Sequence, residues 1–247
     1  MAPPGFGHQL PLPYVAAHRG ARRLAPENTL AAFSAAIDSG ALGIELDVHL
    51  SADGRVVVIH DDLLDRTTDG QGPVSEVSYD DLRKLDAGSW WSAEFSGERL
   101  PLLEEVFELA QSQTVLHVEL KGQAVDTLAA EVVNLARRFS ASQRVLAMSF
   151  NLEAVLAVRR LAADIPALPI VGKALPDPVA FVEEMGLSGL NQAVGRWGPS
   201  AVGEFHERGW LVHGSLVNSR EEVAGFFARG GDMVDSDEPG CFREDRT

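Results

Sequence analysis

Cysteine and positive charge are scarce in this 247-residue sequence. Its one cysteine, Cys241, has no second cysteine with which to form an internal disulfide, so nothing indicates an oxidising compartment. Lysine and arginine number 21 against 36 aspartates and glutamates, which gives a formal net charge of −15. Because nucleic acids and anionic membranes are bound by cationic surfaces, this balance argues against both as principal partners.

A long apolar run is also missing. Four prolines break the longest uncharged stretch, residues 1–18, and no lysine or arginine precedes a compact apolar segment there. The stretch therefore has the features neither of a membrane span nor of a signal peptide. We interpret residues 1–13 as a proline-rich leader in front of a cytoplasmic domain.

From Tyr14 onward, short β-branched or apolar runs alternate with helical patterns, which is typical of parallel strands joined by helices. Asp177 before Pro178, and Ser219 three residues before Glu222, are expected helix caps. The candidate parallel strands are residues 14–18, 43–48, 114–120, 145–149, 167–171, 189–193, 210–216 and 232–236. Eight such units in a single domain, residues 14–247, favour an α/β fold of the TIM-type (β/α)8 barrel class over an open sheet.

Residues 56–60 have a strand pattern that follows the second strand after only four residues, too short for a parallel crossover. We therefore expect an antiparallel hairpin return. If Leu50 lies opposite Arg55, then Glu45 lies opposite His60, and opposed residues point to the same face. Asp47 shares that face because side chains alternate along a strand.

Residues 61–100 interrupt the alternation with Gly, Ser and Asp and with the pair Trp90-Trp91. An excursion of this length between strands is usually functional. We expect an insertion that acts as a lid, and a merely decorative insertion is the alternative.

Charged side chains gather at the ends of three predicted strands. Glu45 and Asp47 lie on one face of the second strand, and Glu119 ends the third. In barrels of this kind the carboxyl ends of the strands form the active site. Three carboxylates in one place repel each other unless a cation neutralises them, and an all-oxygen set favours Mg²⁺ or Ca²⁺ over zinc.

Basic side chains accompany these carboxylates. Arg19 and Lys121 follow the first and third strands, and they predict an anion-binding centre beside the metal. His18 and His60 add two groups that titrate near neutrality, as proton transfer at an attacking and a leaving oxygen requires.

With these residues in view, the sequence resembles the glycerophosphodiester phosphodiesterase family over nearly its whole length, most densely from residue 17 to 121. The matching motifs, in the family's order, are Ala17-His18-Arg19-Gly20, Pro26-Glu27-Asn28-Thr29, Ala32-Phe33, Glu45-Leu46-Asp47-Val48, Asp53-Gly54, His60-Asp61, Asp65-Arg66-Thr67-Thr68, Leu100-Pro101, Leu103-Glu104-Glu105, Val118-Glu119-Leu120-Lys121 and Ser149-Phe150.

The resemblance implies a role for each of these charged residues. It implies that one divalent cation, Mg²⁺ or Ca²⁺ with Mn²⁺ as a further candidate, is bound by Glu45, Asp47 and Glu119. The acid/base pair would be His18 and His60, and the phosphate contacts would come from Arg19 and Lys121. Glu27 would support the same centre; alternatively, it is a charge in the first turn of a helix, where the dipole favours it.

The C-terminal third departs from the family pattern. Where the family usually has Trp-Thr-Val-Asn, this chain reads Ser215-Leu216-Val217-Asn218, so an expected aromatic wall is missing and recognition of the alcohol moiety is in doubt. His213, Trp197 and the pair Trp90-Trp91 are candidates for that surface, none of which the sequence favours. Asp235 also stands where an apolar residue is usual.

The implied activity is metal-dependent hydrolysis of a small-molecule glycerophosphodiester to glycerol 3-phosphate and an alcohol. Two alternatives remain: a related phosphodiesterase that acts on a lipid headgroup, and a non-catalytic barrel that binds a phosphorylated ligand. The net charge and the lack of a basic or amphipathic docking segment favour a soluble diester and no stable membrane association. Oligomeric state and headgroup preference stay open.

Overall fold

The structure is a computed structural model that describes residues 12–110 and 114–241. Residues 1–11 of the expected leader, 1–13, lie outside the described residues. The strands are β1 (Tyr14–Ala17), β2 (Gly43–Leu50), β3 (Val56–Val58), β4 (Val115–Leu120), β5 (Val145–Ser149), β6 (Ala167–Val171), β7 (Gly189–Ala193), β8 (Leu211–Ser215) and β9 (Met233–Ser236).

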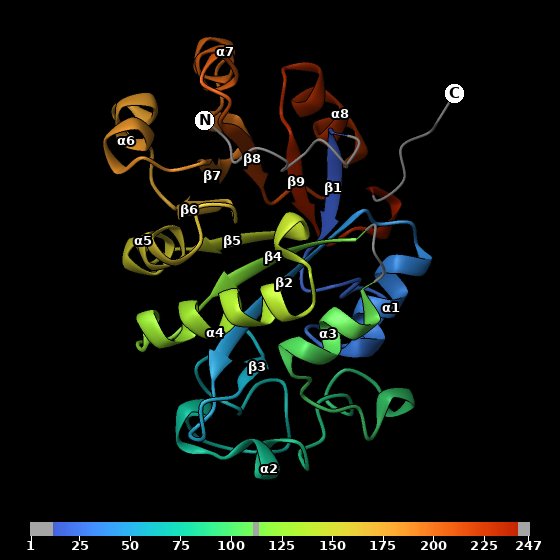
Figure 1. Ribbon diagram of the computed structural model, residues 1–247. Coiled ribbons are helices and arrows are strands. Elements are labelled where there is room, and N and C mark those ends of the chain that lie inside the picture. The colour runs from blue at the N-terminus through green and yellow to red at the C-terminus, as the bar shows by residue number, and fades with distance from the viewer. Residues whose placement is uncertain (1–11, 111–113, 242–247) are drawn as a thin grey trace.

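Eight of these strands close into a ring. They are hydrogen-bonded in the order β1-β9-β8-β7-β6-β5-β4-β2, and β2 pairs with β1 again. All pairings within the ring are parallel, so the eight predicted strand segments form a TIM-type barrel. Figure 1 shows the strands at the centre with helices around them.

The helices cover the outside of the barrel, except α2 (Tyr79–Leu82), which belongs to the insertion. Their bounds are α1 (Leu30–Asp38), α2 (Tyr79–Leu82), α3 (Leu103–Leu109), α4 (Val125–Arg138), α5 (Leu152–Leu161), α6 (Pro178–Met185), α7 (Pro199–Glu207) and α8 (Arg220–Ala228), and short 3-10 turns lie at Val74–Glu76, Ala93–Phe95, Ser142–Arg144, Val194–Arg196 and Pro239–Cys241. The expected caps are present. Asp177 accepts a hydrogen bond from the Ala180 amide and Ser219 accepts one from the Glu222 amide.

Apolar packing forms two layers. The larger lies between strands and helices and includes Phe33 of α1 and Leu128 of α4, both buried. A smaller cluster, with Leu146, Leu168 and Met233, comes from the alternate residues that point into the barrel.

β3 pairs antiparallel with the far end of β2, with Val48 opposite Val58. The expected register is wrong by one residue, because Ser51 rather than Leu50 lies opposite Arg55. The Ser51 amide donates to the Arg55 carbonyl and the Ser51 hydroxyl accepts from the Arg55 amide, so the turn has three residues and not four. In this register, simple opposition no longer aligns His60 with Glu45.

The insertion, residues 61–100, folds around a small apolar cluster of its own. Leu64, Val74 and Leu82 are buried there together with Val57 of β3, and α2 lies at its outer side (Figure 1). It is therefore packed against the hairpin and has a core that can hold its polar side chains in place.

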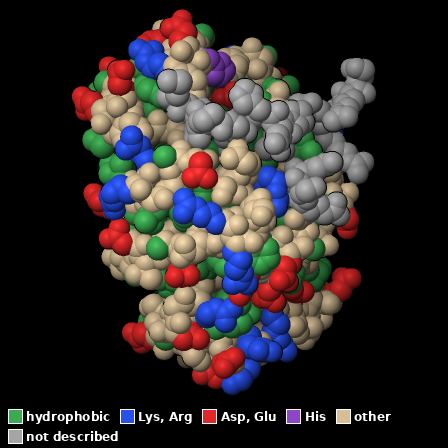
Figure 2. All heavy atoms as spheres, viewed as in Figure 1, with side chains coloured by type: hydrophobic (Ala, Val, Ile, Leu, Met, Phe, Trp, Pro, Cys, Tyr) green, Lys and Arg blue, Asp and Glu red, His purple; other side chains and the backbone are tan. Residues whose placement is uncertain are grey.

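Acidic and basic side chains are interspersed on the face shown in Figure 2, including the lower part formed by the insertion. Among the described residues, no helix has the length and apolar content that a membrane crossing requires.

Candidate active site

The predicted carboxylates meet at the carboxyl end of the barrel. β2 and β4 are neighbours in register, with Asp47 paired to Glu119, and Glu45 lies two residues earlier on the same face of β2. One oxygen from each of the three carboxylates lies within 4.8 Å of the others. The candidate acidic metal site expected from the sequence is therefore present as a geometric cluster.

The three carboxylates differ in their electrostatics. Burial raises the pKa of Glu45 well above its usual range, and the charge of Asp47 adds to the shift. Burial also raises the pKa of Glu119 to about 7, and Asp47 again adds to it. For Asp47 burial acts in the same direction, but Lys121 and Arg19 outweigh it and bring the pKa below its usual value. Without a cation, the carboxylates reduce their mutual repulsion by binding protons. A bound cation would reduce the same repulsion and leave the carboxylates ionised.

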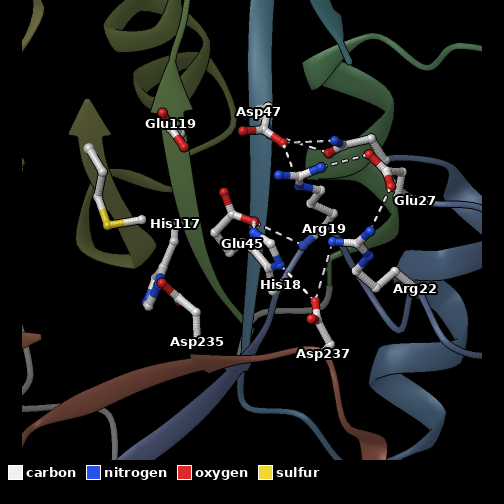
Figure 3. A network of polar contacts seen from close by, with 12 residues as sticks. His18, Arg19, Arg22, Glu27, Glu45, Asp47, His117, Glu119, Asp235 and Asp237 are labelled. Carbon is white, nitrogen blue, oxygen red and sulfur yellow. Dashed lines mark hydrogen bonds and ion pairs between the residues drawn. The ribbon is translucent and has the colours of Figure 1, made fainter. Parts of the chain in front are cut away.

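Arg19 and Lys121 face these carboxylates. The Lys121 Nζ lies 2.7 Å from Glu119 Oε1 and 3.3 Å from Asp47 Oδ1. The Arg19 Nε lies 3.5 Å from Asp47 Oδ2, and Figure 3 shows its guanidinium between Asp47 and Glu27. Arg19 has a left-handed backbone, with φ of 56°, which directs its amide to donate to Glu45 Oε2 at 2.8 Å.

The donor set fits a hard divalent cation. Asp47 Oδ1 and Glu119 Oε1 are buried without a hydrogen-bond partner of good geometry, although Lys121 is close to both. Asp47 Oδ2 instead accepts from the Asn28 side-chain amide at 2.8 Å, which fixes the orientation of that carboxylate. Two oriented carboxylate oxygens with free lone pairs are what Mg²⁺, Ca²⁺ or Mn²⁺ requires.

His18 follows β1 directly and lies at the edge of the carboxylate cluster. Its Nδ1 is 2.8 Å from Asp237 Oδ1, just after β9, and its Nε2 is 3.9 Å from Glu45 Oε2. The hydrogen bond to Asp237 keeps the ring in one orientation. Burial would raise the pKa of Asp237, but His18 holds it down at about 2, so the carboxylate is ionised at neutral pH.

His60 enters the same pocket from the hairpin despite the shifted register. The Ile59 amide still donates to the Asp47 carbonyl, and His60 comes directly after it, where its side chain lines the pocket together with Glu45 and Glu119. Its Nδ1 is 2.5 Å from Asp61 Oδ1, and Arg66 in turn donates to Asp61. Burial lowers the pKa of His60 more than the neighbouring carboxylates raise it.

Glu27 lies behind the cluster and not in a helix. α1 begins at Leu30 with Thr29 as its cap, so the interpretation as a first-turn charge is wrong. Its buried carboxylate accepts hydrogen bonds from Arg19 and Arg66, each at 2.8 Å. These two guanidiniums lower the pKa of Glu27 although burial acts against them. Glu27 thus connects Arg19 to the insertion.

The pocket that holds these groups has an apolar side, formed by two residues to which the motifs gave no role. Phe150 and Leu216 line it and are 64% and 43% exposed. Lys121 Nζ lies 5.9 Å from the centre of the Phe150 ring. Leu216 occupies the region of the missing family Trp, so the two side chains form the apolar surface beside the charged groups.

The other candidates for that surface lie elsewhere. Trp197 is buried and donates from Nε1 to the His213 carbonyl, and the His213 side chain is itself fully buried. Trp90 and Trp91 belong to the insertion, where Trp91 Nε1 donates to the Arg22 carbonyl. None of these lines the pocket.

Sequence reasoning missed the polar residues that orient the predicted ones. Asn28 and Asp61 lay within the matching motifs, and Asp237 follows the last predicted strand, but no role was attached to any of them. Their contacts span 219, 1 and 19 positions of the chain. Only the spacing of histidine beside aspartate in His60-Asp61 could have indicated such a contact.

Comparisons with known proteins identify the family of the chain. The model of the glycerophosphoryl diester phosphodiesterase family matches residues 18–241. A glycerophosphodiester phosphodiesterase of Caldanaerobacter subterraneus subsp. tengcongensis is 33% identical over 228 residues, which cover 91% of this chain and 94% of that protein.

Solved structures give the same result. A phosphodiesterase of Oleispira antarctica in complex with its product sn-glycerol-3-phosphate superposes with a TM-score of 0.83 at 32% identity, covering 92% of this chain and 94% of that one. A glycerophosphodiester phosphodiesterase from Agrobacterium tumefaciens has a TM-score of 0.83 at 28% identity, covering 93% and 98% of the two chains.

Proposed function

Since the chain belongs to the glycerophosphoryl diester phosphodiesterase family, we propose that it hydrolyses a small glycerophosphodiester to glycerol 3-phosphate and an alcohol. One observation carries this proposal: two imidazoles, each bonded through Nδ1 to a carboxylate, lie in one pocket with Glu45 and Glu119. A barrel that only bound phosphate would have no need of two oriented proton carriers. The complex of the Oleispira relative with sn-glycerol-3-phosphate supports the same product.

Glu45, Asp47 and Glu119 would hold the divalent cation, Mg²⁺, Ca²⁺ or Mn²⁺. When bound, the cation supplies positive charge that stabilises the negative charge developing on the phosphate oxygens. Arg19 and Lys121 contribute cationic donors on the same side of the pocket, and Arg19 suits planar contacts to phosphate. Phe150 and Leu216 offer apolar surface to the alcohol moiety.

His18 and His60 carry the protons. Nδ1 of each ring is engaged by its carboxylate, so the free Nε2 exchanges protons with the substrate. One imidazole takes a proton from the nucleophile as the new P–O bond forms. The other gives a proton to the departing alkoxide as the old P–O bond breaks. The nucleophile is either water or the glycerol 2-hydroxyl, which gives a cyclic phosphate that water opens.

The test is release of glycerol 3-phosphate from glycerophosphocholine by the full chain. We expect release with Mg²⁺, Ca²⁺ or Mn²⁺ and none after EDTA, with recovery when the metal is restored. Failure with every metal and with a panel of glycerophosphodiesters would favour the binding barrel. Strong cosedimentation with liposomes, together with cleavage of lysophospholipid and not of soluble diester, would favour the lipid-headgroup alternative.

A matched pair of variants links the activity to the carboxylates. Glu119→Gln should lose activity and cation affinity together, because it removes one charged oxygen ligand. Glu108→Gln makes the same chemical change on the exposed side of α3 and should behave as the unmodified protein. Equal behaviour of the two variants would contradict the proposed cation site.

A further inference from the structure

A second polar group lies inside the barrel, below the carboxylates of the active site. Its members are His117 of β4, His213 of β8 and Asp235 of β9, and all three are buried. Apolar side chains of the barrel interior surround them, among them Leu146 and Met148. Charged and ring-nitrogen groups in such surroundings require compensation, because burial of polar atoms without partners is costly.

The Asp235 carboxylate lies between the two imidazoles. Its Oδ1 is 3.1 Å from His117 Nδ1 and its Oδ2 is 3.0 Å from His213 Nε2, and the two ring centroids are 5.0 Å apart. One ligand atom from each residue lies within 4.8 Å of the others. Ligands around a tetrahedral zinc ion are separated by about 3.4 Å. The three groups therefore need only small shifts to share one ion.

His213 has two buried ring nitrogens that lack hydrogen-bond partners. Its side chain is 0% exposed, yet neither ring nitrogen has a hydrogen-bond partner of good geometry, because the Asp235 oxygen lies off the line of the N–H. The Asn191 Oδ1, on the neighbouring β7 and in register with His213, is also buried and unpartnered. Buried polar atoms without partners are costly, so these atoms in one place point to a ligand that would satisfy them.

The second ring nitrogen of His117 is hydrogen-bonded to another side chain, as is usual for histidines that bind a metal. Its Nε2 lies 2.8 Å from the Tyr14 hydroxyl, whose own proton is directed to the sulfur of Met233. The Nδ1 of His117 is also hydrogen-bonded to Asp235 Oδ1 at 3.1 Å. With Nε2–H donating to the Tyr14 hydroxyl, Nδ1 carries no proton of its own and can bind a cation, which then takes the place of the hydrogen bond to the carboxylate.

An ion can reach this place through the pocket already described. Asp235 and Asn191 line its floor together with Met148 and Ile170. Figure 3 shows His117 and Asp235 side by side next to Glu45. The inner group thus forms a lower level of the same opening, with nitrogen ligands where the upper level has only oxygen.

We propose that His117, His213 and Asp235 form a second cation site, separate from the catalytic carboxylates and selective for a zinc-class dication. Two imidazoles and one carboxylate suit Zn²⁺ or Co²⁺, whereas Mg²⁺ prefers oxygen ligands alone. Asn191 or a water from the pocket completes the ligand set. Bound Zn²⁺ neutralises Asp235 and gives His213 its missing partner.

The experiment uses the full chain, freed of metal and then held in a large excess of Mg²⁺, with Zn²⁺ or Co²⁺ as the probe. Equilibrium dialysis should show zinc bound in addition to Mg²⁺, and Co²⁺ should give the intense visible absorption of a tetrahedral site. Crystals soaked in Zn²⁺ should show an anomalous peak between His117 and His213. No zinc-class binding in the unmodified protein, or density of a water alone, would overturn the proposal.

Variants locate the binding. His213→Asn should weaken it by at least about 100-fold, and the milder Tyr14→Phe, which keeps the ring, by about 10–100-fold. His206→Asn is the control, because His206 is an exposed histidine that pairs with Asp232 and does not belong to the inner group. Binding that survives both inner variants, or that is lost in the control, would place the ion at the surface and refute the site.

Discussion

The two imidazoles of the active site are held by two different parts of the molecule. His18 follows β1, and its partner Asp237 follows the adjacent β9, 219 positions away in sequence. His60 is held by the next residue, Asp61, which Arg66 of the insertion contacts in turn. The first pair is the less exposed, 18% and 15% against 29% and 31%. The barrel thus orients one of the two imidazoles, and a local loop structure orients the other.

This comparison shows how one pocket combines rigidity and access. The backbones of His18 and Asp237 directly follow two paired barrel strands, so the barrel sets the positions from which the two side chains meet. A ring held by a neighbour in sequence depends on the insertion that packs against it. The two sides should therefore respond differently to substitution, although both imidazoles serve the same proposed reaction.

The largest effect should come from removing either ring. His18→Ala and His60→Ala should each lower kcat by about 10²–10⁴, because each removes one of two proton transfers. Cation affinity, measured by isothermal titration calorimetry, should remain near that of the unmodified protein, since neither ring belongs to the carboxylate set. A near-normal rate in either variant would end the comparison, because that imidazole would then carry no proton.

Next in size are the orienting carboxylates. Asp237→Asn and Asp61→Asn should each lower kcat/KM by about 100-fold, because a misplaced ring loses its productive geometry. Loss of a negative charge beside an imidazole disfavours its protonated form, so one limb of the pH–rate profile should move to lower pH. The limb that moves identifies the base or the acid. Asp126→Asn, on the exposed end of α4, is the control and should leave the profile unchanged.

If both carboxylate variants moved the same limb, the two imidazoles would not divide the roles of acid and base. If neither moved a limb while activity still fell, the carboxylates would act on folding alone. Circular dichroism of each variant separates that case from the catalytic one.

A smaller effect, on stability and cation affinity, concerns Glu119, which contacts neither of the two imidazole–carboxylate pairs. Its folded-state pKa of about 7 exceeds the unfolded value near 4.3, so the metal-free folded protein binds the extra proton between these values. The free energy of unfolding should therefore fall as pH rises from about 4.5 to about 7. A bound dication expels that proton, so its affinity should rise over the same window, by up to about tenfold per pH unit.

Urea unfolding with and without Mg²⁺ measures the first trend, and calorimetry at several pH values measures the second. Glu119→Gln should abolish the pH dependence of stability that Glu119 contributes. An affinity that stays flat between pH 5 and pH 7 would show that the carboxylate is already ionised without the ion.

The smallest effect should come from Arg66, which contacts Asp61 and Glu27 and is 42% exposed. Arg66→Gln should lower the free energy of unfolding by less than about 1 kcal/mol, because ion pairs at this exposure are weak. It should lower kcat/KM less than Asp61→Asn does. The limb of the pH–rate profile that Asp237→Asn moves should stay unchanged. A loss as large as that of Asp61→Asn would mean that the insertion, and not Asp61, orients His60.

Sequence reasoning reached the barrel and the charged residues because both have local signals. Each parallel strand is a short apolar run, and Glu45, Asp47 and Glu119 lie at strand ends where side chains of a barrel converge. The register of the hairpin was off by one because Ser51 still pairs with Arg55, which shortens the turn to three residues. That hydroxyl contact has no periodic signature.

Contacts across the ring closure could not be predicted in the same way. The pairing of His18 with Asp237 depends on β1 meeting β9, which only the closed barrel shows. The inner group of His117, His213 and Asp235 was missed for the same reason. Each residue alone resembles an ordinary buried polar side chain, and the three meet only because β4, β8 and β9 contribute to one level of the barrel.

The junction of the first and last strands has a consequence for biosynthesis. A chain emerging from the ribosome presents His18 early, but the strand that supplies Asp237 is made near the end. Until β9 inserts between β1 and β8, the imidazole has no carboxylate and the ring of strands stays open. We therefore expect a partly synthesised polypeptide to lack activity until β9 has joined the barrel.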